Sequence, residues 1–463
     1  MVNVLKFFAV IGDYFPSTPK PARRPDLKFR LLFTLASLVI YYAMASTLVY
    51  PLAKYGVTGV QLPTLISIVF ASQQGTLAQL GIGPIVTAGL ILQILVGAKI
   101  LNIDLRDPEG RRLFTQSQKG LAIIIAIVEG LGYAMYYRLE SYVTLIIFAQ
   151  FMLGAIFLLM IDETIQKGWG IGSGVSLFIL AGVARSIVWD IFAPVKIPGT
   201  DEYHGIIPYL IQTVMGGSLS SERLFYGYVA GVNRAVPSLT GLISVLLLMF
   251  VLIYLQGIKV HIPVTTQRAP GIRARVPLQF LYVTNIPILL VGILFSDLIL
   301  FYNIASTYLA DSVPWLANAL SAAVTYLAPP SSLIEIYVNP LRVTAYAVLL
   351  LVLAVLFGYM WVEIAGLNPA AQAENLINSG LEIPGIRRNP KVLESLLAKY
   401  IYPLTVLSSL IVALIALVAD IFSAYGTGTG ILLTVGILQQ YYTMIAYERA
   451  LEAYPLLKRL IGE

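Results

Sequence analysis

The sequence predicts an all-α polytopic membrane protein with ten transmembrane helices. Of the 463 residues, 58% are hydrophobic and only 12% are charged, whereas about a quarter of the residues of a soluble domain are charged. The mean hydropathy is +0.82. A hydrocarbon core of about 30 Å needs about 20 helical residues. The spans predicted from apolar runs are 29–50, 76–98, 118–137, 143–161, 173–192, 238–258, 278–300, 341–361, 400–420 and 427–447.

The second apolar segment is interrupted. Residues 61–71 are apolar but too short to cross a bilayer, and the polar stretch 72–75 separates them from the run that starts at Thr76. Irregular backbone at membrane depth is tolerated only where protein buries it or where it lines a watery cavity. We therefore expect the chain to enclose a cavity in which a short helical piece lies.

Basic residues gather on one side of this topology. If the amino terminus is cytosolic, most of the 30 Lys and Arg residues fall in cytosolic segments. The positive-inside rule then predicts that both termini of this multi-pass protein are cytosolic. The net charge of +6 is thus concentrated on one face. These charges either set the topology alone or form a docking surface for anionic lipid head groups or RNA.

The spans divide into five and five about a long external loop. An odd number of spans in each half gives the halves opposite orientations, so any internal repeat is inverted. Residues 6–14 are predicted to form an amphipathic helix on the membrane surface. The predicted segments are a cytosolic amino-terminal segment 1–28, a first half 29–192, an external loop 193–237, a second half 238–447 with cytosolic loops 259–277 and 362–399 and external loop 301–340, and a cytosolic tail 448–463.

The sequence lacks the residues that common catalytic sites need. It has no cysteine and two histidines, and it contains none of the motifs HExxH, GxSxG or GxxxxGK[ST]. The glycine clusters 168–174 and 426–430 lead into apolar spans without a phosphate-binding lysine, which favours helix starts or close packing. We expect no enzyme activity, no catalytic residue, no metal and no cofactor, so another component must supply any driving force.

Five motifs, in order along the whole chain, resemble the SecY family, the large (alpha) subunits of the Sec protein-conducting channel (translocon), in its archaeal version. They are 80–89 (LGIGPIVTAG), 170–174 (GIGSG), 285–287 (NIP), 384–387 (PGIR) and 424–430 (AYGTGTG). The resemblance implies two inverted five-helix halves that form a clamshell around an hourglass pore. It implies a passive gated channel that moves unfolded secretory polypeptides, driven by the ribosome or another partner, and releases transmembrane segments through a lateral gate.

The resemblance also implies a plug and a pore ring. Residues 61–74 match the plug, a short helix that seals the outer funnel at rest. Residues four apart share a helix face, so Ile82 with Val86 and Val175 with Ile179 present aliphatic stripes, and a narrow aliphatic constriction dewets and blocks ions. The plug residues are Leu62, Leu65, Ile66, Ile68, Val69 and Phe70. The ring residues are Ile82, Val86, Val175, Ile179, Leu289 and either Leu432 or its neighbour Ile431.

The family's lateral gate lies between spans two and three on one side and seven and eight on the other. Its polar cluster maps to Thr87, Glu129 and Asp297, and the last position is commonly Asn in the family. Two carboxyls within a few ångströms of each other are not comfortably ionised together. We therefore hypothesise that one of them is protonated at rest and that the pair weakens gate closure.

The resemblance implies partners as well. The expected partners are signal sequences, nascent polypeptides, membrane lipid, the ribosome, and two small membrane subunits that resemble SecE and Sec-beta. The SecE-like subunit is expected to clamp both halves from behind. The candidate ribosome-binding residues are Arg268, Arg273, Arg275, Arg387 and Arg388.

An ion-coupled solute transporter is the alternative from another class. Such transporters keep carboxylates at the midplane of broken helices, but Asp297, Glu363 and Asp420 lie near span ends and only Glu129 is placed deep. An intramembrane enzyme is a second alternative, and it lacks a paired nucleophile and base. Co-purification of a SecE-like subunit distinguishes a protein channel from a transporter.

Overall fold

The fold is described here from a computed structural model. Its described residues are 2–23, 25–55, 64–98, 100–101, 103, 107–216, 220–229, 236–266, 273–308, 314–330, 332–379, 381–382 and 389–453.

Each predicted span coincides with a helix. Among the described residues, eight helices are long and apolar enough to cross a membrane, in agreement with the predicted all-α polytopic fold. The helices at the predicted spans are α2 (Leu27–Ser46), α5 (Gly83–Gly97), α6 (Pro108–Tyr136), α7 (Ser141–Thr164), α8 (Gly174–Phe192), α10 (Leu239–Gly257), α11 (Ile286–Tyr308), α14 (Pro340–Ile364), α16 (Pro390–Ile421) and α17 (Gly428–Ala453). Helices α5 and α17 are not among the eight.

Two predicted span starts are wrong. The segment predicted from residue 76 becomes helical only at Gly83, because an isolated bridge at Thr76 is followed by turns and bends over 77–82 and Pro84 lies in the first turn of the helix. The segment predicted from residue 278 becomes helical at Ile286, since its first residues end a strand and form a turn. Apolar composition alone does not separate a helix from the apolar turn that precedes it.

Two helices extend further than predicted. α6 starts at Pro108, where the side chain of Asp107 accepts a hydrogen bond from the Gly110 N–H at 3.2 Å. α16 starts at Pro390, where the Asn389 side chain accepts from the Lys391 N–H at 3.0 Å. An Asx residue followed by proline is a helix-start signal, so both extensions are written in the sequence.

The amino-terminal helix α1 (Val2–Tyr14) packs against α6. The Ser117 hydroxyl donates to the carbonyl of Leu5 at 2.9 Å. Gly12 and Gly120 let the two backbones meet, because a Cβ on Gly120 would lie 1.9 Å from the Phe8 carbonyl oxygen. The helix predicted at 6–14 is confirmed, and protein covers one of its faces.

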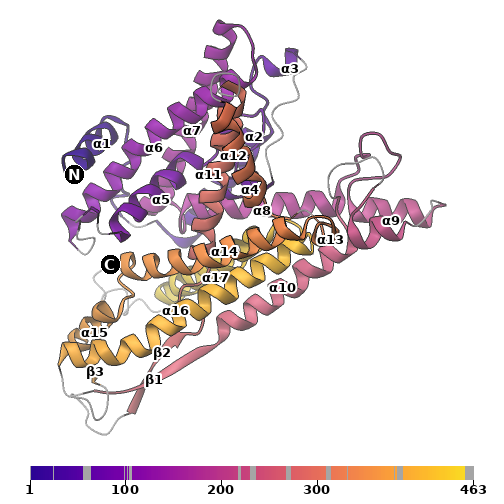
Figure 1. Ribbon diagram of the computed structural model, residues 1–463. Helices are drawn as coiled ribbons and strands as arrows, with labels where there is room; N and C mark the ends of the chain where they lie inside the picture. Colours follow the sequence, from indigo (N-terminus) through magenta and orange to yellow (C-terminus); the bar gives the residue numbers. More distant parts are fainter. Residues whose placement is uncertain are drawn as a thin grey trace.

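The two long basic loops meet in one small sheet. Strand β1 (Lys259–Thr266) pairs antiparallel with β2 (Arg273–Gln279) and with β3 (Leu381–Glu382), so the strand order is β2-β1-β3. Helix α15 (Pro369–Asn378) lies beside β3. The end of the molecule formed by α1, this sheet and α15 is called the basic end below (Figure 1).

The predicted external loops contain ordered helices. The loop 193–237 carries α9 (Ile206–Val214) and the π-helical turn η2 (Glu222–Tyr226), and the loop 301–340 carries α12 (Pro314–Leu327) and α13 (Glu335–Val338). Arg223 organises the first of these, since its fully buried guanidinium donates to the His204 carbonyl at 2.9 Å and stacks 5.0 Å from the Tyr209 ring.

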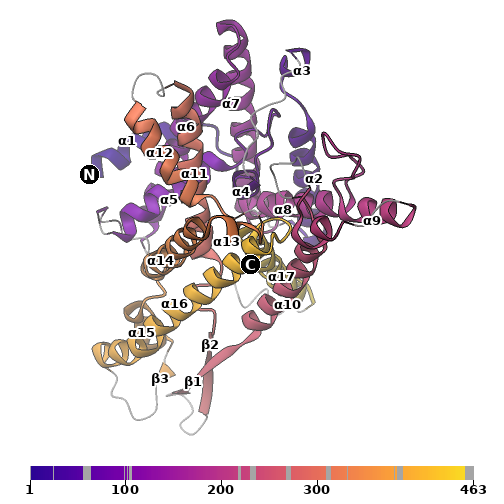
Figure 2. The ribbon, with the colours of Figure 1, turned by 45° about the vertical axis from the view of Figure 1, so that its right-hand side comes forward.

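The helices fall into two groups around a central space. Helices α2, α5, α6 and α7 form one group, and α10, α14, α16 and α17 form the other (Figures 1 and 2). Helix α8 packs along α17, and α11 packs against both α14 and α5. The short helix α4 (Thr64–Val69) lies in contact with α8, α11 and α17. The remaining elements are the one-turn helix α3 (Leu52–Tyr55) and the π-helical turn η1 (Ile165–Trp169).

Candidate functional site

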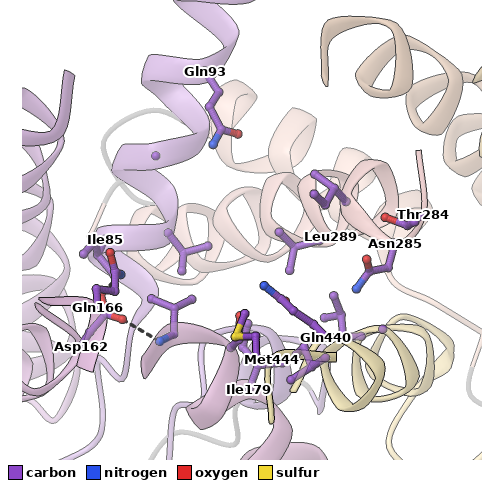
Figure 3. Close-up of a pocket in the computed structure, with 18 of the residues that line it drawn as sticks. Ile85, Gln93, Asp162, Gln166, Ile179, Thr284, Asn285, Leu289, Gln440 and Met444 are labelled. Atoms are coloured by element: carbon purple, nitrogen blue, oxygen red, sulfur yellow. Dashed lines mark hydrogen bonds between the residues drawn. The ribbon is translucent and has the colours of Figure 1, made fainter. Parts of the chain in front are cut away.

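A cavity of about 1570 Å³ lies between the two helix groups. Its mouth includes Lys20, Lys119, Gln279 and Tyr447, so it opens toward the basic end. Figure 3 shows side chains of several elements projecting into it, among them Gln93 and Leu289. The interrupted second segment predicts such a cavity, but no described residue of the short helix at 64–69 lines it.

The inner wall of the cavity is aliphatic. Val86 of α5, Val175 and Ile179 of α8, Leu289 of α11 and Leu433 of α17 all line it. They pack in one hydrophobic cluster that draws on both helix groups. A cavity that is polar at its mouth and aliphatic at its inner end can admit a chain and still resist water and ions at the narrow level.

Four of the predicted ring residues, Val86, Val175, Ile179 and Leu289, line the cavity, and two do not. Ile82 is 3% exposed and packs in the same hydrophobic cluster without lining the large cavity.

On α17, neither Leu432 nor Ile431 lines the cavity, and Leu433 does. One residue turns a helix by about 100°, so the motif located the right turn of α17 and missed the lining side chain by one position.

The predicted plug segment is docked behind the aliphatic wall. Ile66, Ile68, Val69 and Phe70 are 2% exposed or less. The segment is closed by a hydrogen bond from the Ile82 N–H to the Phe70 carbonyl at 2.8 Å. Leu62 lies outside the described residues, and so does the side chain of Leu65.

Glycine 81 makes this docking possible. Its φ is +55°, and a Cβ there would lie 2.1 Å from the Phe70 carbonyl oxygen. The Tyr41 hydroxyl of α2 adds a hydrogen bond to the Ala71 carbonyl at 3.0 Å. The first glycine of the 80–89 motif therefore brings the plug segment against the start of α5.

The predicted gate cluster joins two helices directly. The Thr87 hydroxyl of α5 donates to Asp297 Oδ1 of α11 at 2.8 Å. Glu129 of α6 is 1% exposed, its Oε1 has no hydrogen-bond partner among the described residues, and Asp297 lies close enough to repel it electrostatically. The structure therefore brings all three residues together where α5, α6 and α11 meet.

The comparisons with known proteins agree on one family. The family model SecY matches residues 76–442. Protein translocase subunit SecY of Aeropyrum pernix is 48% identical over 471 residues, which cover 100% of this chain and 99% of that protein. The corresponding subunit of Saccharolobus solfataricus is 45% identical over 477 residues, with both chains fully covered. The chain belongs to the SecY family.

Solved structures agree with this membership. A chain described as a protein conducting channel superposes with a TM-score of 0.79 at 30% identity, covering 96% of this chain and 97% of that one. Canine Sec61 in a ribosome-channel complex from the endoplasmic reticulum gives 0.77 at 29% identity and the same coverage. The family consists of protein-translocation channels, so this SecY-family chain is a multi-pass membrane protein and part of a passive conduit, and the resemblance inferred from five motifs is confirmed.

The candidate ribosome-binding arginines of this SecY-family chain lie on the basic end or outside the described part. Arg273 and Arg275 belong to β2, where their backbones pair with Thr265 and Pro263. Arg268, Arg387 and Arg388 lie outside the described residues. All five belong to the two loops that the sheet joins.

The sequence analysis missed the polar lining of the cavity. Gln93, Gln118, Gln256, Gln279 and Gln440 come from different elements and face the same space. Several charged groups at the mouth are paired, since Lys119 and Lys167 bind Glu163 at 3.0 and 2.7 Å. These residues share no sequence motif, so only the fold brings them together.

Proposed function

We propose that this chain is the pore-forming subunit of the Sec translocon, through which unfolded secretory polypeptides cross the membrane. The observation that carries the proposal is the cavity, which opens at the basic end and ends on an aliphatic wall with the plug segment buried behind it. An extended chain threads this wall once the plug segment has moved. The ring consists of Val86, Val175, Ile179, Leu289 and Leu433, with Ile82 packed behind them.

The polar contact between α5 and α11 is the proposed lateral gate. A signal sequence with 7–15 apolar residues would enter between these helices and replace the Thr87–Asp297 contact by contacts of its own. Apolar spans of a membrane protein leave sideways because lipid solvates them better than the pore does. The gate contact is a single hydrogen bond, so its rupture costs about 0.5–3 kcal/mol.

The basic end is proposed to face the cytosol of a cell whose plasma membrane holds the channel. The positive charge of its loops favours this orientation and suits contacts with ribosomal RNA phosphates. Two small single-span subunits resembling SecE and Sec-beta are proposed to complete the complex. The ribosome or another partner supplies the driving force.

A single-cysteine experiment tests the proposed pore. The chain has no cysteine, so Val86→Cys gives a unique thiol in the cavity wall. A secretory chain with one cysteine is arrested part-way on ribosomes, and the sample is oxidised. We expect a disulfide that forms only when the signal sequence is functional. A control variant, Phe250→Cys, carries its thiol on a side chain that is 74% exposed on α10. Crosslinks to the control position alone would refute the proposed path.

A further inference from the structure

We propose that Asp162 and Asp420 are matched positioning residues, one in each half, that fix the helices carrying Ile179 and Leu433. The proposal rests on the constriction assigned above. Each carboxylate comes from the end of one helix and holds the start of the next, and in each case the next helix carries a residue of the cavity wall.

In the first half, Asp162 near the end of α7 holds the start of α8. Its Oδ1 accepts a hydrogen bond from the Val175 N–H at 2.9 Å and one from the Ser173 hydroxyl at 3.3 Å. Its Oδ2 accepts from Gln166 at 2.8 Å. The N-cap residue Ser173 makes no side-chain cap of its own. The first turn of a helix leaves N–H groups unpaired, and here the preceding helix satisfies one of them.

In the second half, Asp420 near the end of α16 holds the start of α17. Its Oδ1 accepts a hydrogen bond from the Gly428 N–H at 2.7 Å. Its Oδ2 accepts from the Tyr346 hydroxyl of α14 at 2.8 Å. Both aspartates are buried, at 2% and 6% exposure. A buried carboxylate that accepts several hydrogen bonds fixes its neighbours strongly, because breaking one bond leaves a buried charge unsatisfied.

The two caps also share their close packing. A Cβ on Gly174 would lie 2.6 Å from the Asp162 Cα, and a Cβ on Gly428 would lie 2.1 Å from the Ala416 carbonyl oxygen. Both glycines belong to the clusters whose function the sequence left open between helix starts and close packing. Ile179 is the fifth residue after the first glycine, and Leu433 is the fifth after the second. The halves therefore present their constriction residues from equivalent positions.

Each cap lies inside one half, and this gives it a function in gating. Asp162 joins α7 to α8, and Asp420 joins α16 and α17 to α14, which packs against α11 and α5 at the gate. The proposal therefore implies that, when the gate opens, Ile179 follows α7 and Leu433 follows α16 and α14. The carboxylates thus convert a separation of the halves into a widening of the aliphatic ring.

The test measures which face of α17 lines the cavity in the resting complex in membrane vesicles. Single thiols are introduced by Leu433→Cys or Leu432→Cys, and a membrane-impermeant maleimide is applied from the basic end. With Asp420 present, we expect Leu433→Cys, on the cavity wall, to react roughly tenfold faster or more than Leu432→Cys, which does not line the cavity and needs a local opening to react. Adding Asp420→Leu should bring the ratio toward one. Adding Asp420→Asn should preserve it, because the amide oxygen still accepts the Gly428 N–H.

A matched control is Asp190→Leu, which removes a partly buried acid from the far end of α8, where it contacts His204 at 3.3 Å. It should leave the ratio unchanged. An unchanged ratio in a folded Asp420→Leu complex would overturn the proposal. If Asp420→Leu does not accumulate, Asp162→Leu is tested through Ile179→Cys and Phe178→Cys on α8, and an unchanged ratio there overturns it equally.

These measurements use the resting complex without substrate. They therefore fail or succeed independently of the Val86→Cys crosslink to a translocating chain, which tests the proposed pore itself.

Discussion

Asp297 is the residue at which the proposed gate responds most directly to charge. It accepts the Thr87 hydroxyl at 2.8 Å, and the buried Glu129 lies within its electrostatic reach. Removing one of two neighbouring buried carboxyls relieves repulsion and keeps the hydrogen bond if an amide takes its place. We therefore expect the closed gate to be less stable with Asp297 than it would be with Asn at this position.

We predict that Asp297→Asn stabilises the closed gate. Secretory chains with weakened signal sequences should then be translocated several-fold less efficiently than by the unchanged channel. The measurement is translocation into proteoliposomes of matched secretory chains with intact and with weakened signal sequences. Equal efficiency of the two channel forms with the weakened signal sequence would contradict the prediction, and Glu363→Gln, outside the gate cluster, is the control.

At the residue scale, a motif places a segment but does not fix which face of its helix lines a cavity. Four residues that the family resemblance assigned to the ring, Val86, Val175, Ile179 and Leu289, line the cavity. On α17 the glycine-rich motif identified the correct turn and not Leu433, because the helix start is set by Asp420 from another helix. A contact between segments leaves no local signal in the chain.

At the scale of elements, hydropathy predicted the spans and missed the structures between them. Apolar length is a property of one segment, so α2, α7, α8 and α10 were found within a few residues. The sheet β2-β1-β3 pairs two loops far apart in sequence, and the shortest of its strands has two residues. Such pairing depends on the fold that brings the loops together.

The sheet gives the two basic loops one common base. Tyr282, which follows β2, donates to the Leu367 carbonyl at 2.6 Å, and its burial raises the pKa of its hydroxyl to about 12. This hydroxyl therefore stays a donor throughout the physiological pH range and ties the start of α11 to the segment before α15. Both loops are thus presented together at the basic end.

We predict that Arg387→Glu weakens ribosome binding at low salt by roughly tenfold or more. The substitution removes a phosphate contact and puts a negative charge where a positive one was. The logarithm of affinity should fall less steeply with the logarithm of salt concentration in this variant. The assay is co-sedimentation of the reconstituted complex with ribosomes from 50 to 200 mM salt, a range over which such contacts weaken strongly. Arg111→Glu, on the exposed start of α6, is the matched control. Unaltered affinity at low salt would remove Arg387 from the binding surface.

At the scale of the whole molecule, the two inverted halves were predicted from the number of spans alone. The sequence shows no clear repeat, yet Asp162 and Asp420 hold equivalent helix starts. The feature that repeats is an aspartate that accepts a hydrogen bond from the start of the next helix. The spacing from Asp162 to Gly174 differs from that between Asp420 and Gly428, so a sequence alignment does not detect the repeat. The clamshell is thus a property of contacts more than of residue order.

The two halves are also tied to each other at the basic end. Arg30 of α2 lies 2.7 Å from Glu448 of α17 and also donates to the Gly170 carbonyl at 3.0 Å. The two side chains are 10% and 14% exposed, so water screens this ion pair only partly. The ion pair joins α2, the first span, to α17, the last span, at the cavity mouth. The hydrogen bond between Thr87 and Asp297 is a separate contact, between α5 and α11.

We predict that this ion pair couples the halves and resists their separation. In a double-mutant cycle with Arg30→Gln and Glu448→Gln, the coupling energy should be about 0.5–3 kcal/mol, the range found for contacting groups in one network. Each single variant should also translocate chains with weakened signal sequences more efficiently, because the halves part more easily. Thermal unfolding of the purified complex and proteoliposome translocation measure the two effects. The control Lys196→Gln removes an exposed ion pair with Asp201 at 2.9 Å and should change neither the thermal unfolding nor the translocation. Additive effects of Arg30→Gln and Glu448→Gln would show that their ion pair does not link the halves.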